Sequence, residues 1–368
     1  MFSFLTSQLG RYIFKQTLLS IFLALAGVAA AVLLVDVVEQ LRTIGARVQL
    51  SLPMAVFLTS LKAPQLLEQT LPFVVLIGTM VALTRLNRRS ELIAIRAAGI
   101  SAWRFLAPAA AAAFTVGMVA SLALNPLAAR LYEAYEGQVA DLMGDNPDKN
   151  ANRGIWLRQG DKSQQVVIHA DSVDTGAGAL AHPAFTFFDV EKDGSLRFDR
   201  RMSADRAELK EGFWQLTGVR EARPGAPVAY YQHLALPTAL RSSALFDRFV
   251  NPASLSFWRL PGYIAQAKAS GVAPVRYELA WYSLIAAPLF LVAMASLGAV
   301  FSLRLQRLGG VAQLAGTGVA IGFGLYFSSR LVAAFAEADL TPPLLAAWAA
   351  PAVGFFSAMA VLSYIEDG

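Results

Sequence analysis

Long stretches without a single charged residue recur along the chain. Five of them contain 19 to 26 residues each. A helix needs about 20 consecutive, mostly apolar residues to cross a bilayer core, where only internal hydrogen bonds can satisfy its backbone. The pattern therefore predicts five membrane-spanning helices, at 17–35, 105–129, 279–303, 308–329 and 340–365.

A sixth apolar stretch, 69–84, is shorter than this length. Apolar residues resume at 48–61, on the far side of a short segment that contains charges and proline. We interpret the two stretches as one long second helix, interrupted by polar residues, that begins near Pro53.

The segment 130–278 has a different pattern, because charges are frequent and apolar residues alternate with polar ones, as in "AFTFFDVEKDGSLRFDRR". This alternation is typical of half-buried strands and predicts an all-β domain. Asp193 and Gly194 separate two alternating runs and predict a tight hairpin, since glycine tolerates the positive φ of such turns. The following "NPASLSFWRLPGYIAQAKASG" predicts a juxtamembrane helix that ends at Gly271, with a kink at Pro261.

Composition supports this architecture. Hydrophobic residues make up 56% of the 368 residues and charged residues only 15%, against about 25% charged in ordinary soluble domains. The mean hydropathy is +0.48. A net charge of +5 could favour nucleic acid, but many basic residues flank apolar runs instead of clustering on a polar face. The chain has no cysteine, which excludes disulfides and thiolate chemistry.

The predicted fold class is a membrane α-helical protein of six helices, three on each side of an inserted extracytoplasmic all-β domain. Its predicted segments are 1–129, 130–253, 254–278 and 279–368. Lys and Arg gather on the cytoplasmic side of membrane proteins. If Arg11 and Lys15 are cytoplasmic, both termini are cytoplasmic and the β domain lies outside. The basic segment 85–104 and the residues Arg304 and Arg307 are then cytoplasmic, as the positive-inside rule expects. The loop with Glu337 and Asp339 is then outside, which also agrees with the rule.

The predicted cytoplasmic loop contains the segment "RLNRRSELIAIRAAGIS". Ser90 is a suitable N-cap, Glu91 complements the positive end of a helix dipole, and Gly99 can terminate the helix. We therefore predict a short helix at about 88–99. This water-facing loop would present four apolar residues, namely Leu92, Ile93, Ile95 and Ala97. The arginines Arg88, Arg89 and Arg96 would surround them.

Two interpretations of this helix stay open from its residues. It could lie at the membrane interface, with its arginines on lipid phosphates. It could instead dock into a groove of a cytoplasmic partner protein. The arginines favour lipid, whereas the isolated carboxylate of Glu91 favours a protein, because anionic lipid would repel it.

Charges at membrane depth form a second group of candidates, because they are costly there and usually face a bundle interior or a cavity. Lys62, Glu68 and Arg330 are of this kind. The alternative is that they are structural, with Lys62 paired to Glu68 or with the side chains extended to the interface. Arg42 and Arg47 lie where the head-group phosphates of an anionic lipid would be bound.

No motif for catalysis is apparent. The chain lacks a phosphate-binding Gly-x-x-x-x-Gly-Lys-Ser/Thr loop and a Gly-x-Ser-x-Gly nucleophile elbow. Its three histidines, His169, His182 and His233, have no spacing that would build a metal site. We therefore expect no catalytic residue, no bound metal and no cofactor in this chain.

Taken together, these segments resemble the LptF/LptG family of lipopolysaccharide export permeases of Gram-negative inner membranes. The resemblance covers nearly the whole chain. It depends on "RYIFKQTL", on Pro64 and Pro72, on "RSELIAIRAAGIS" and on the layout of three helices, a domain and three helices. Details resemble the LptG side of the family, namely "VDVVEQLR", "LSFWRLPGYIAQAKASG", "RYEL" and Pro342–Pro343.

The resemblance implies an ABC-type exporter that extracts lipopolysaccharide from the outer leaflet of the inner membrane. Its partners would be an LptF-like permease, an LptB-like ATPase dimer that binds ATP and Mg²⁺, LptC, and the periplasmic bridge protein LptA. The inserted domain would be a jellyroll that passes lipopolysaccharide to this bridge.

The resemblance also implies roles for single residues. Glu91 matches the acidic coupling-helix residue that engages the ATPase, supported by Arg89, Arg96, Leu92 and Ile95. Arg42 matches a basic position near lipid phosphates, and Arg47, Lys62 and Arg330 would add to it. One departure is Thr43, which stands where a second basic residue is expected.

Two functions from other classes remain as alternatives to export. One is an ion-coupled secondary transporter that uses Lys62, Glu68 and Arg330, although the halves show no sequence repeat. The other is a membrane scaffold that binds a partner without transport.

Overall fold

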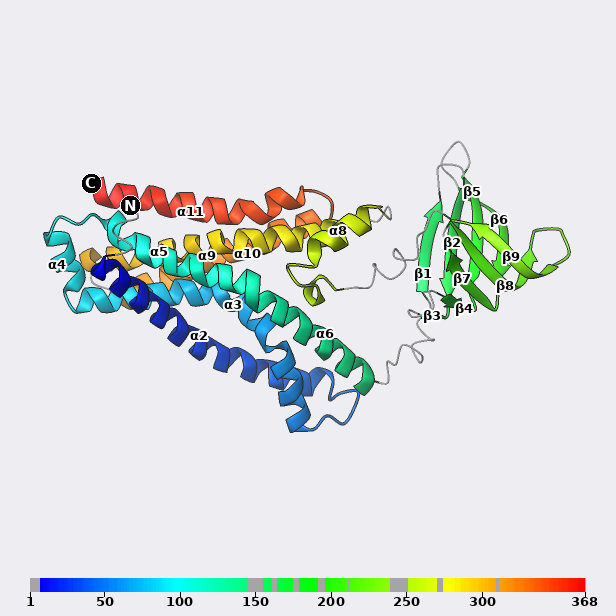
Figure 1. Cartoon of the computed structure of the whole chain (residues 1–368), viewed down its shortest axis with the longest axis horizontal. Helices are drawn as coiled ribbons and strands as arrows, with labels where there is room; N and C mark the ends of the chain where they lie inside the picture. Colours follow the sequence, from blue (N-terminus) through cyan, green and yellow to red (C-terminus); the bar gives the residue numbers. More distant parts are fainter. Residues whose placement is uncertain are drawn as a thin grey trace. The chain divides into compact units, whose positions relative to one another are not determined.

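The computed structural model describes residues 7–143, 155–160, 164–174, 179–190, 196–210, 212–238, 251–269, 274–308 and 311–367. The chain divides into two compact units. The first is a helical bundle and the second contains the β sheet (Figure 1).

Within the described residues, six helical segments of the first unit are long and apolar enough to cross a membrane. This confirms the predicted number. The segments are α2 (Gln8–Thr43), α3 (Leu52–Arg88), α5 (Ala102–Val119) continued through the π-helix η1 (Ala120–Leu124) into α6 (Asn125–Leu142), α9 (Val275–Leu308), α10 (Val311–Glu337) and α11 (Pro343–Asp367).

Helix α3 confirms the prediction of a single, interrupted second helix. It starts with proline in its first turn and continues without a break through Pro64 and Pro72. With 37 residues and a rise of about 1.5 Å per residue it is about 55 Å long, well beyond the roughly 30 Å of a bilayer core. The apolar run 69–84 covers only part of this length, and the helix extends past that run at both ends.

Helix α9 is the most buried of the membrane spans, and it packs against α3, α5, α10 and α11. Several helix contacts depend on glycine, as two examples show. A Cβ on Gly78 would lie 2.6 Å from Cα of Ile21, and one on Gly117 would lie 2.5 Å from Cα of Pro288. These contacts bring α3 against α2 and α5 against α9, so the bundle is packed closely, as is typical of small residues between membrane helices.

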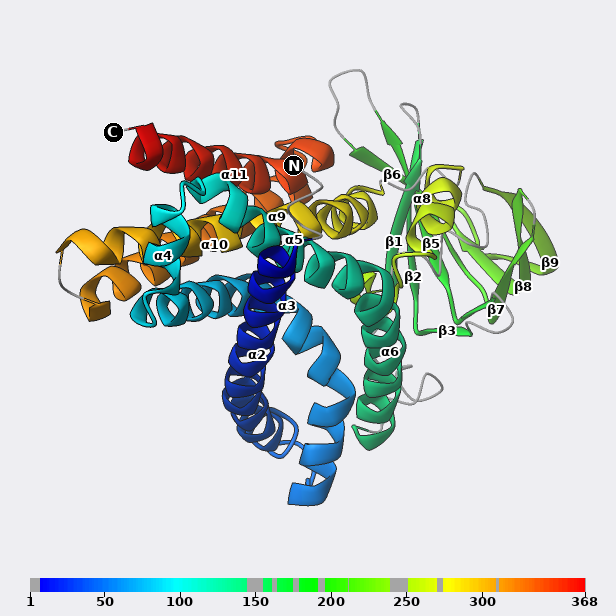
Figure 2. The same cartoon turned by 60° about the vertical axis from the view of Figure 1, so that its left-hand side comes forward.

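Helices α2 and α10 contribute much less to the bundle interior, since only 11% of the most apolar window of each is buried. Large apolar side chains on both helices are exposed, including Leu34, Phe323 and Phe327. Figure 2 shows these helices within the bundle from a second direction. In a membrane these faces would be covered by lipid or by another membrane protein.

The second unit confirms the predicted all-β domain. Its described strands form one antiparallel sheet of nine, in the order β1-β2-β5-β6-β8-β7-β4-β3, with β9 paired to the other edge of β8. The strands are β1 (Ile155–Gly160), β2 (Gln164–Ala170), β3 (Ser172–Asp174), β4 (Ala179–Ala181), β5 (Ala184–Val190), β6 (Leu196–Ser203), β7 (Arg206–Lys210), β8 (Phe213–Ala222) and β9 (Ala229–Pro237).

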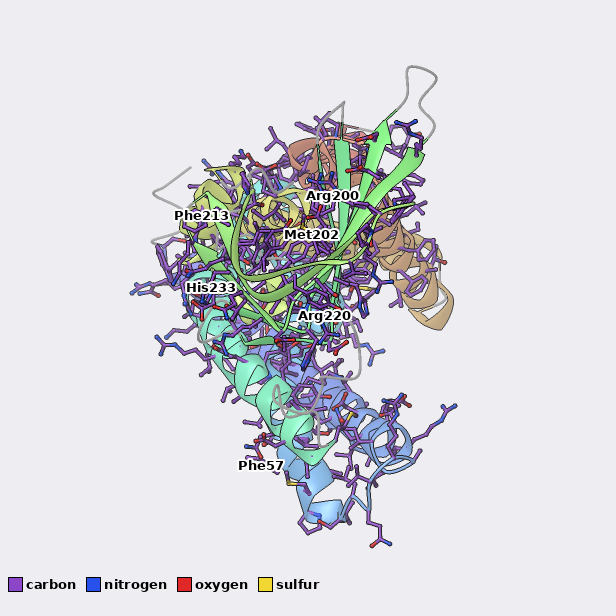
Figure 3. All side chains as sticks on the ribbon, turned by 90° about the vertical axis from the view of Figure 1, so that its right-hand side faces the viewer. Phe57, Arg200, Met202, Phe213, Arg220 and His233 are labelled. Carbon is purple, nitrogen blue, oxygen red and sulfur yellow. The ribbon has the colours of Figure 1, made fainter. Side chains whose placement is uncertain are left out.

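Strand alternation explains the interior of this sheet. Along β8 exposed and buried positions alternate, with a change of phase at Gly218. The buried positions include Trp214, which packs edge-on against Phe185 of β5. Met202 of β6 is also buried, whereas Phe213 and His233 are exposed (Figure 3). The sheet therefore has one apolar side that forms the core of the unit.

The connection after the sheet differs from the prediction in one respect. A short 3-10 turn, η3 (Pro252–Ser254), precedes α8 (Leu260–Ala269). Pro261 is the second residue of α8, where its missing N–H costs nothing, so it begins the helix and does not kink it. The predicted end at Gly271 and the predicted hairpin turn at Asp193–Gly194 lie outside the described residues.

Candidate functional site

The short helix predicted between the second and third spans is present as α4 (Glu91–Ala97). Its ends follow the sequence signals in part. The carbonyl of Ser90 accepts the first helical bond, from Ala94 at 3.0 Å, but Ser90 has φ 60, unlike the extended backbone of an ordinary N-cap. Gly99 has φ 76, and the N–H of Ile100 donates to the carbonyl of Ile95 at 3.3 Å, which is the glycine-terminated helix end that was predicted.

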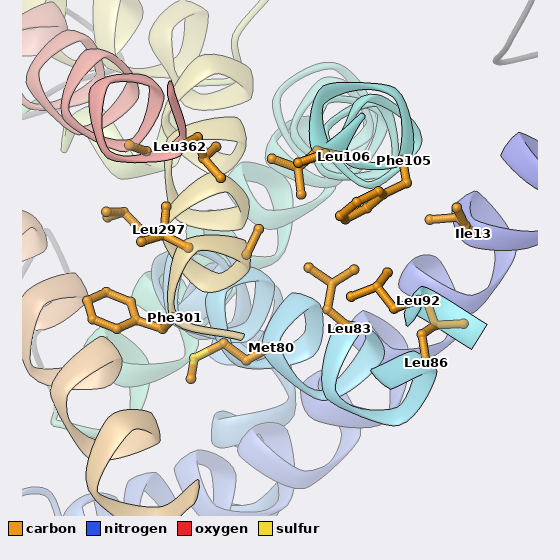
Figure 4. Close-up of a cluster of buried hydrophobic side chains, with 14 of the residues drawn as sticks. Ile13, Met80, Leu83, Leu86, Leu92, Phe105, Leu106, Leu297, Phe301 and Leu362 are labelled. Carbon is orange, nitrogen blue, oxygen red and sulfur yellow. The ribbon is translucent and has the colours of Figure 1, made fainter. Parts of the chain in front are cut away.

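The apolar side of α4 faces the bundle, which corrects the expectation that it would be presented to water. Leu92 is 1% exposed and Ile95 is 9% exposed. Both belong to a buried cluster that includes Ile13 of α2, Leu86 of α3 and Phe105 of α5 (Figure 4). Helix α4 therefore packs into a buried cluster that it shares with three membrane helices.

The outer side of α4 carries small and charged residues. Ala94, Ala97 and Ala98 are exposed, so the backbone of a partner could approach this surface closely. The exposed arginines Arg85, Arg88 and Arg89 lie at the neighbouring end of α3 or directly after it.

Glu91 is not isolated among these arginines. One of its carboxylate oxygens lies 3.9 Å from Nη1 of Arg89, and its side chain is 32% exposed. The Tyr12 side chain of α2 lies beside Glu91. Glu91 therefore has neighbours within the chain, and part of its surface is free. The side chain of Arg96 lies outside the described residues.

A second polar cluster lies inside the bundle, centred on Asp36 of α2, which is 7% exposed. Lys62 of α3 donates to Asp36 Oδ1 at 2.8 Å, and Thr59 donates to Oδ2 at 2.9 Å. Gln40 donates to the same Oδ2 at 3.3 Å and also bonds the hydroxyl of Tyr135 on α6. The suggested pairing of Lys62 with Glu68 is wrong, because Lys62 uses the carboxylate of the facing helix.

The remaining candidates on α2 and after it are on the surface. Arg42 has an 80% exposed side chain and makes only a long contact of 3.9 Å with Glu39, which contributes little to stability in such an exposed position. Arg47 is also exposed. Both guanidinium groups are therefore accessible to a ligand.

Glu68 has a different partner, at the end of the π-helix in the third span. Nδ2 of Asn125 lies 3.3 Å from both carboxylate oxygens of Glu68. The side-chain oxygen of Asn125 accepts the N–H of Phe257 at 2.8 Å. A π-helix leaves carbonyls without their usual partner, and that of Leu122 accepts a bond from Nε1 of Trp258 at 3.3 Å. This region therefore joins α3 to the segment that returns from the β domain.

Glu68 and Arg330 line the same cavity, which has a volume of about 350 Å³. Arg330 donates to the Tyr326 hydroxyl, one turn earlier on α10, at 2.9 and 3.0 Å. The structure thus places two of the three predicted membrane-depth charges at one cavity, and the third, Lys62, in the Asp36 cluster.

The histidines lie in the sheet unit. His182 is exposed, and its Nδ1 is 3.6 Å from a carboxylate oxygen of Asp171. His233 is exposed on β9 opposite Thr217, and His169 pairs with Ala184 across two strands. In the parts of the chain that the structure describes, no three His, Cys, Asp or Glu side chains gather as metal ligands would.

Several residues of these sites carry no local sequence signal. Asn125 and Tyr135 are ordinary polar residues of an amphipathic helix, and Gln40 and Thr59 have no charge. The Glu68–Asn125 contact joins positions that are 57 residues apart, and the Asn125–Phe257 contact joins positions that are 132 residues apart. Only the packing of the helices identifies them.

A bundle of six helices that are long and apolar enough to cross a membrane, interrupted by a β domain, defines a multi-pass membrane protein with an inserted domain. Residues 11–364 match the family described as "Lipopolysaccharide export system permease LptF/LptG", and the chain belongs to this family. It is a permease of the lipopolysaccharide export system, the non-catalytic transmembrane component, and the family implies the inner membrane.

Two relatives show how far the similarity extends. The chain is 25% identical over 333 residues to the lipopolysaccharide export system permease protein LptG of Haemophilus influenzae, which covers 89% of this chain and 90% of that protein. It is 21% identical over 361 residues to LptG of Escherichia coli K12, which covers 96% of each. The prediction of an export permease is confirmed, and the ion-coupled transporter and the scaffold are set aside.

Proposed function

We propose that this chain is the LptG-like half of an ATP-driven lipopolysaccharide exporter. It pairs with an LptF-like permease around a lipid cavity and is powered by an LptB-like ATPase dimer, which binds ATP and Mg²⁺. The extracted lipid passes through LptC and LptA. The similarity to two LptG proteins over most of their length supports this assignment.

Transfer of a lipid out of a bilayer requires an energy source, since each exposed CH₂ costs about 0.8 kcal/mol. The sequence lacks a phosphate-binding loop of the Walker type. In this proposal the energy therefore enters from the ATPase through a contact with the permease.

The proposed orientation places both termini and α4 in the cytoplasm and the β domain in the periplasm. The distribution of Lys and Arg supports it. Basic residues cluster at the α3–α5 connection, whereas the connection between α10 and α11 carries Glu337 and Asp339. An ATPase in the cytoplasm could then reach α4.

Helix α4 is the proposed coupling element, and the single observation that carries this role is its division into two sides. Glu91 keeps an accessible carboxylate for the ATPase, with Arg89 and Arg96 as supporting contacts. Leu92 and Ile95 face the opposite way, into the cluster shared with α2, α3 and α5. A force applied at Glu91 would reach three membrane helices through this packing.

The proposed head-group contacts are Arg42, Arg47, Lys62 and Arg330. Guanidinium groups suit phosphate oxygens geometrically, and Arg42 and Arg47 are exposed at the same end of the bundle. Lys62 is already bound to Asp36, so it would contribute to phosphate binding only after part of that contact is given up. Thr43 donates to the carbonyl of Glu39 and supplies no charge.

The test replaces Glu91 in the complete complex. Glu91→Lys should reduce both co-purification of the ATPase and lipopolysaccharide-stimulated ATP hydrolysis, because the carboxylate contact becomes repulsive. Glu337→Lys, an identical charge change at an exposed position of α10, should leave both unchanged. Normal co-purification and normal stimulated hydrolysis in Glu91→Lys would contradict the coupling role.

A further inference from the structure

The cavity lined by Glu68 and Arg330 contains two opposite charges that do not neutralise each other. Within the described part of the chain, neither side chain has an ion-pair partner within 4.0 Å. Glu68 receives only two long bonds from one amide nitrogen, and Arg330 contacts the hydroxyl and ring of Tyr326. A charge that is partly removed from water is costly unless a partner compensates it, so both groups have unused binding capacity.

The depth of the two groups corresponds to one membrane surface. Glu68 is 17 residues from Arg85, at the basic end of α3, which is about 26 Å along a helix. Arg330 is 19 residues from the start of α10, or about 28 Å. A bilayer core is about 30 Å thick. Both side chains therefore lie near the surface opposite α4, where phospholipid head groups are found.

The size and lining of the cavity limit what can enter. A volume of about 350 Å³ is at the small end for a ligand site, enough for a head group and the first part of its chains but not for a many-chained glycolipid. The wall around the two charges is mixed. Neutral polar side chains include Gln65, Gln69 and Ser329, and apolar ones include Pro72, Leu284 and Phe290.

The two charges select the chemistry of the head group. A guanidinium binds phosphate through paired N–H donors, and a carboxylate accepts hydrogen bonds from an ammonium group. A purely anionic head group would be repelled by Glu68, and a purely cationic one by Arg330. A head group with both charges, separated by a short linker, would satisfy both.

We propose that this cavity binds the phosphoethanolamine head group of a two-chain phospholipid, with the phosphate at Arg330 and the ammonium at Glu68. The ligand is a membrane phospholipid and not the exported glycolipid. Because Asn125 joins Glu68 to the backbone of Phe257, occupation of the cavity would also stabilise the segment that returns from the β domain. The inference shares Arg330 with the proposed head-group contacts, but its binding measurement uses phospholipids without lipopolysaccharide.

The experiment uses the full-length chain purified in its membrane complex. The complex is stripped of lipid, incubated with equal amounts of phosphatidylethanolamine, phosphatidylcholine and phosphatidylglycerol, and analysed for retained lipid by native mass spectrometry. Glu68→Gln keeps the shape of the side chain and its bond with Asn125 but removes the charge. Arg330→Gln removes the phosphate partner. Glu337→Gln and Arg276→Gln are the controls, since both residues are exposed and neither lines the cavity.

The wild-type complex should retain one phosphatidylethanolamine molecule more than either cavity variant, and both controls should match the wild type. Loss of one charge-assisted hydrogen bond should reduce this retention about tenfold or more. Phosphatidylcholine should be retained less, because its trimethylammonium group has no N–H to donate to Glu68.

Three results would overturn the inference. The first is equal retention of all three lipids by the wild type, and the second is unchanged retention in both cavity variants. The third uses the absence of native cysteine: complete disulfide formation by Glu68→Cys with Arg330→Cys in lipid-containing membranes would show that the two positions meet directly. Lipopolysaccharide-stimulated hydrolysis, measured on the same variants, separates failure of this inference from failure of the export proposal.

Discussion

Leu92→Ala should loosen α4 from the bundle without unfolding the bundle itself. Leu92 is 1% exposed, and the substitution removes three buried carbon atoms, each worth about 0.8 kcal/mol. The loss is therefore about 2.4 kcal/mol, before any additional cost of a cavity. If local opening of α4 exposes this side chain, the open population should rise about 50-fold, since every 1.4 kcal/mol is a factor of ten.

Hydrogen exchange measured by mass spectrometry tests this value, because the amides of Ala94, Ala98 and Ile100 are protected by bonds within and at the end of α4. Their exchange should accelerate by about the same 50-fold. Ile95→Val removes a single buried carbon and should give about a fourfold increase. Leu340→Ala, at a position 73% exposed, should change nothing in α4.

If Leu92→Ala changed the exchange rate of α4 by less than about threefold, the Leu92 side chain would contribute far less than its transfer free energy to the attachment of α4. An equal acceleration in all membrane helices would refute the local opening of α4, since α4 would then open only with the whole bundle.

Two further predictions concern the interior of the bundle. Asp36→Asn should lower the thermal stability of the detergent-solubilised chain, since Lys62 loses its charged partner; Lys62→Met should be less harmful in that background than in the wild type. The coupling free energy between the two substitutions should be about 1–3 kcal/mol. This is less than for a fully buried pair, because the Lys62 side chain is 25% exposed. Strictly additive effects of the two substitutions on stability would contradict this prediction. Gly78→Ala should lower the melting temperature by several degrees, because its Cβ would collide with the Ile21 backbone. Gly27→Ala is the matched control, since a Cβ at that position would have nothing within 4 Å. Equal melting temperatures for the two variants would show that the α2–α3 contact is not tight.

The number and order of the membrane helices could be predicted because a bilayer requires about 20 apolar residues in each span. Their ends could not, since α2 and α3 continue as helices beyond the apolar run. The strands were predictable where one side of the sheet is buried, as in β8, whose burial alternates along its length. Pro261 was misjudged because proline is compatible with a helix start as well as with a kink.

The candidate site was predictable where a residue type is unusual for its surroundings. Glu91 among arginines and Arg330 within an apolar helix are of this kind. Partners were not predictable, because a sequence does not give the rotation and register of two packed helices. The Asp36–Lys62 pair joins positions 26 residues apart, and the burial of Leu92 and Ile95 depends on three different helices.

We propose that this permease receives its energy from a separate ATPase through α4. A native mass spectrum of the complex purified through this chain shows whether such an ATPase is bound. We expect one copy of this chain with one LptF-like permease, two copies of a nucleotide-binding subunit and bound lipopolysaccharide. A complex that carries lipopolysaccharide and transports it with no nucleotide-binding subunit would show that the energy does not enter through α4.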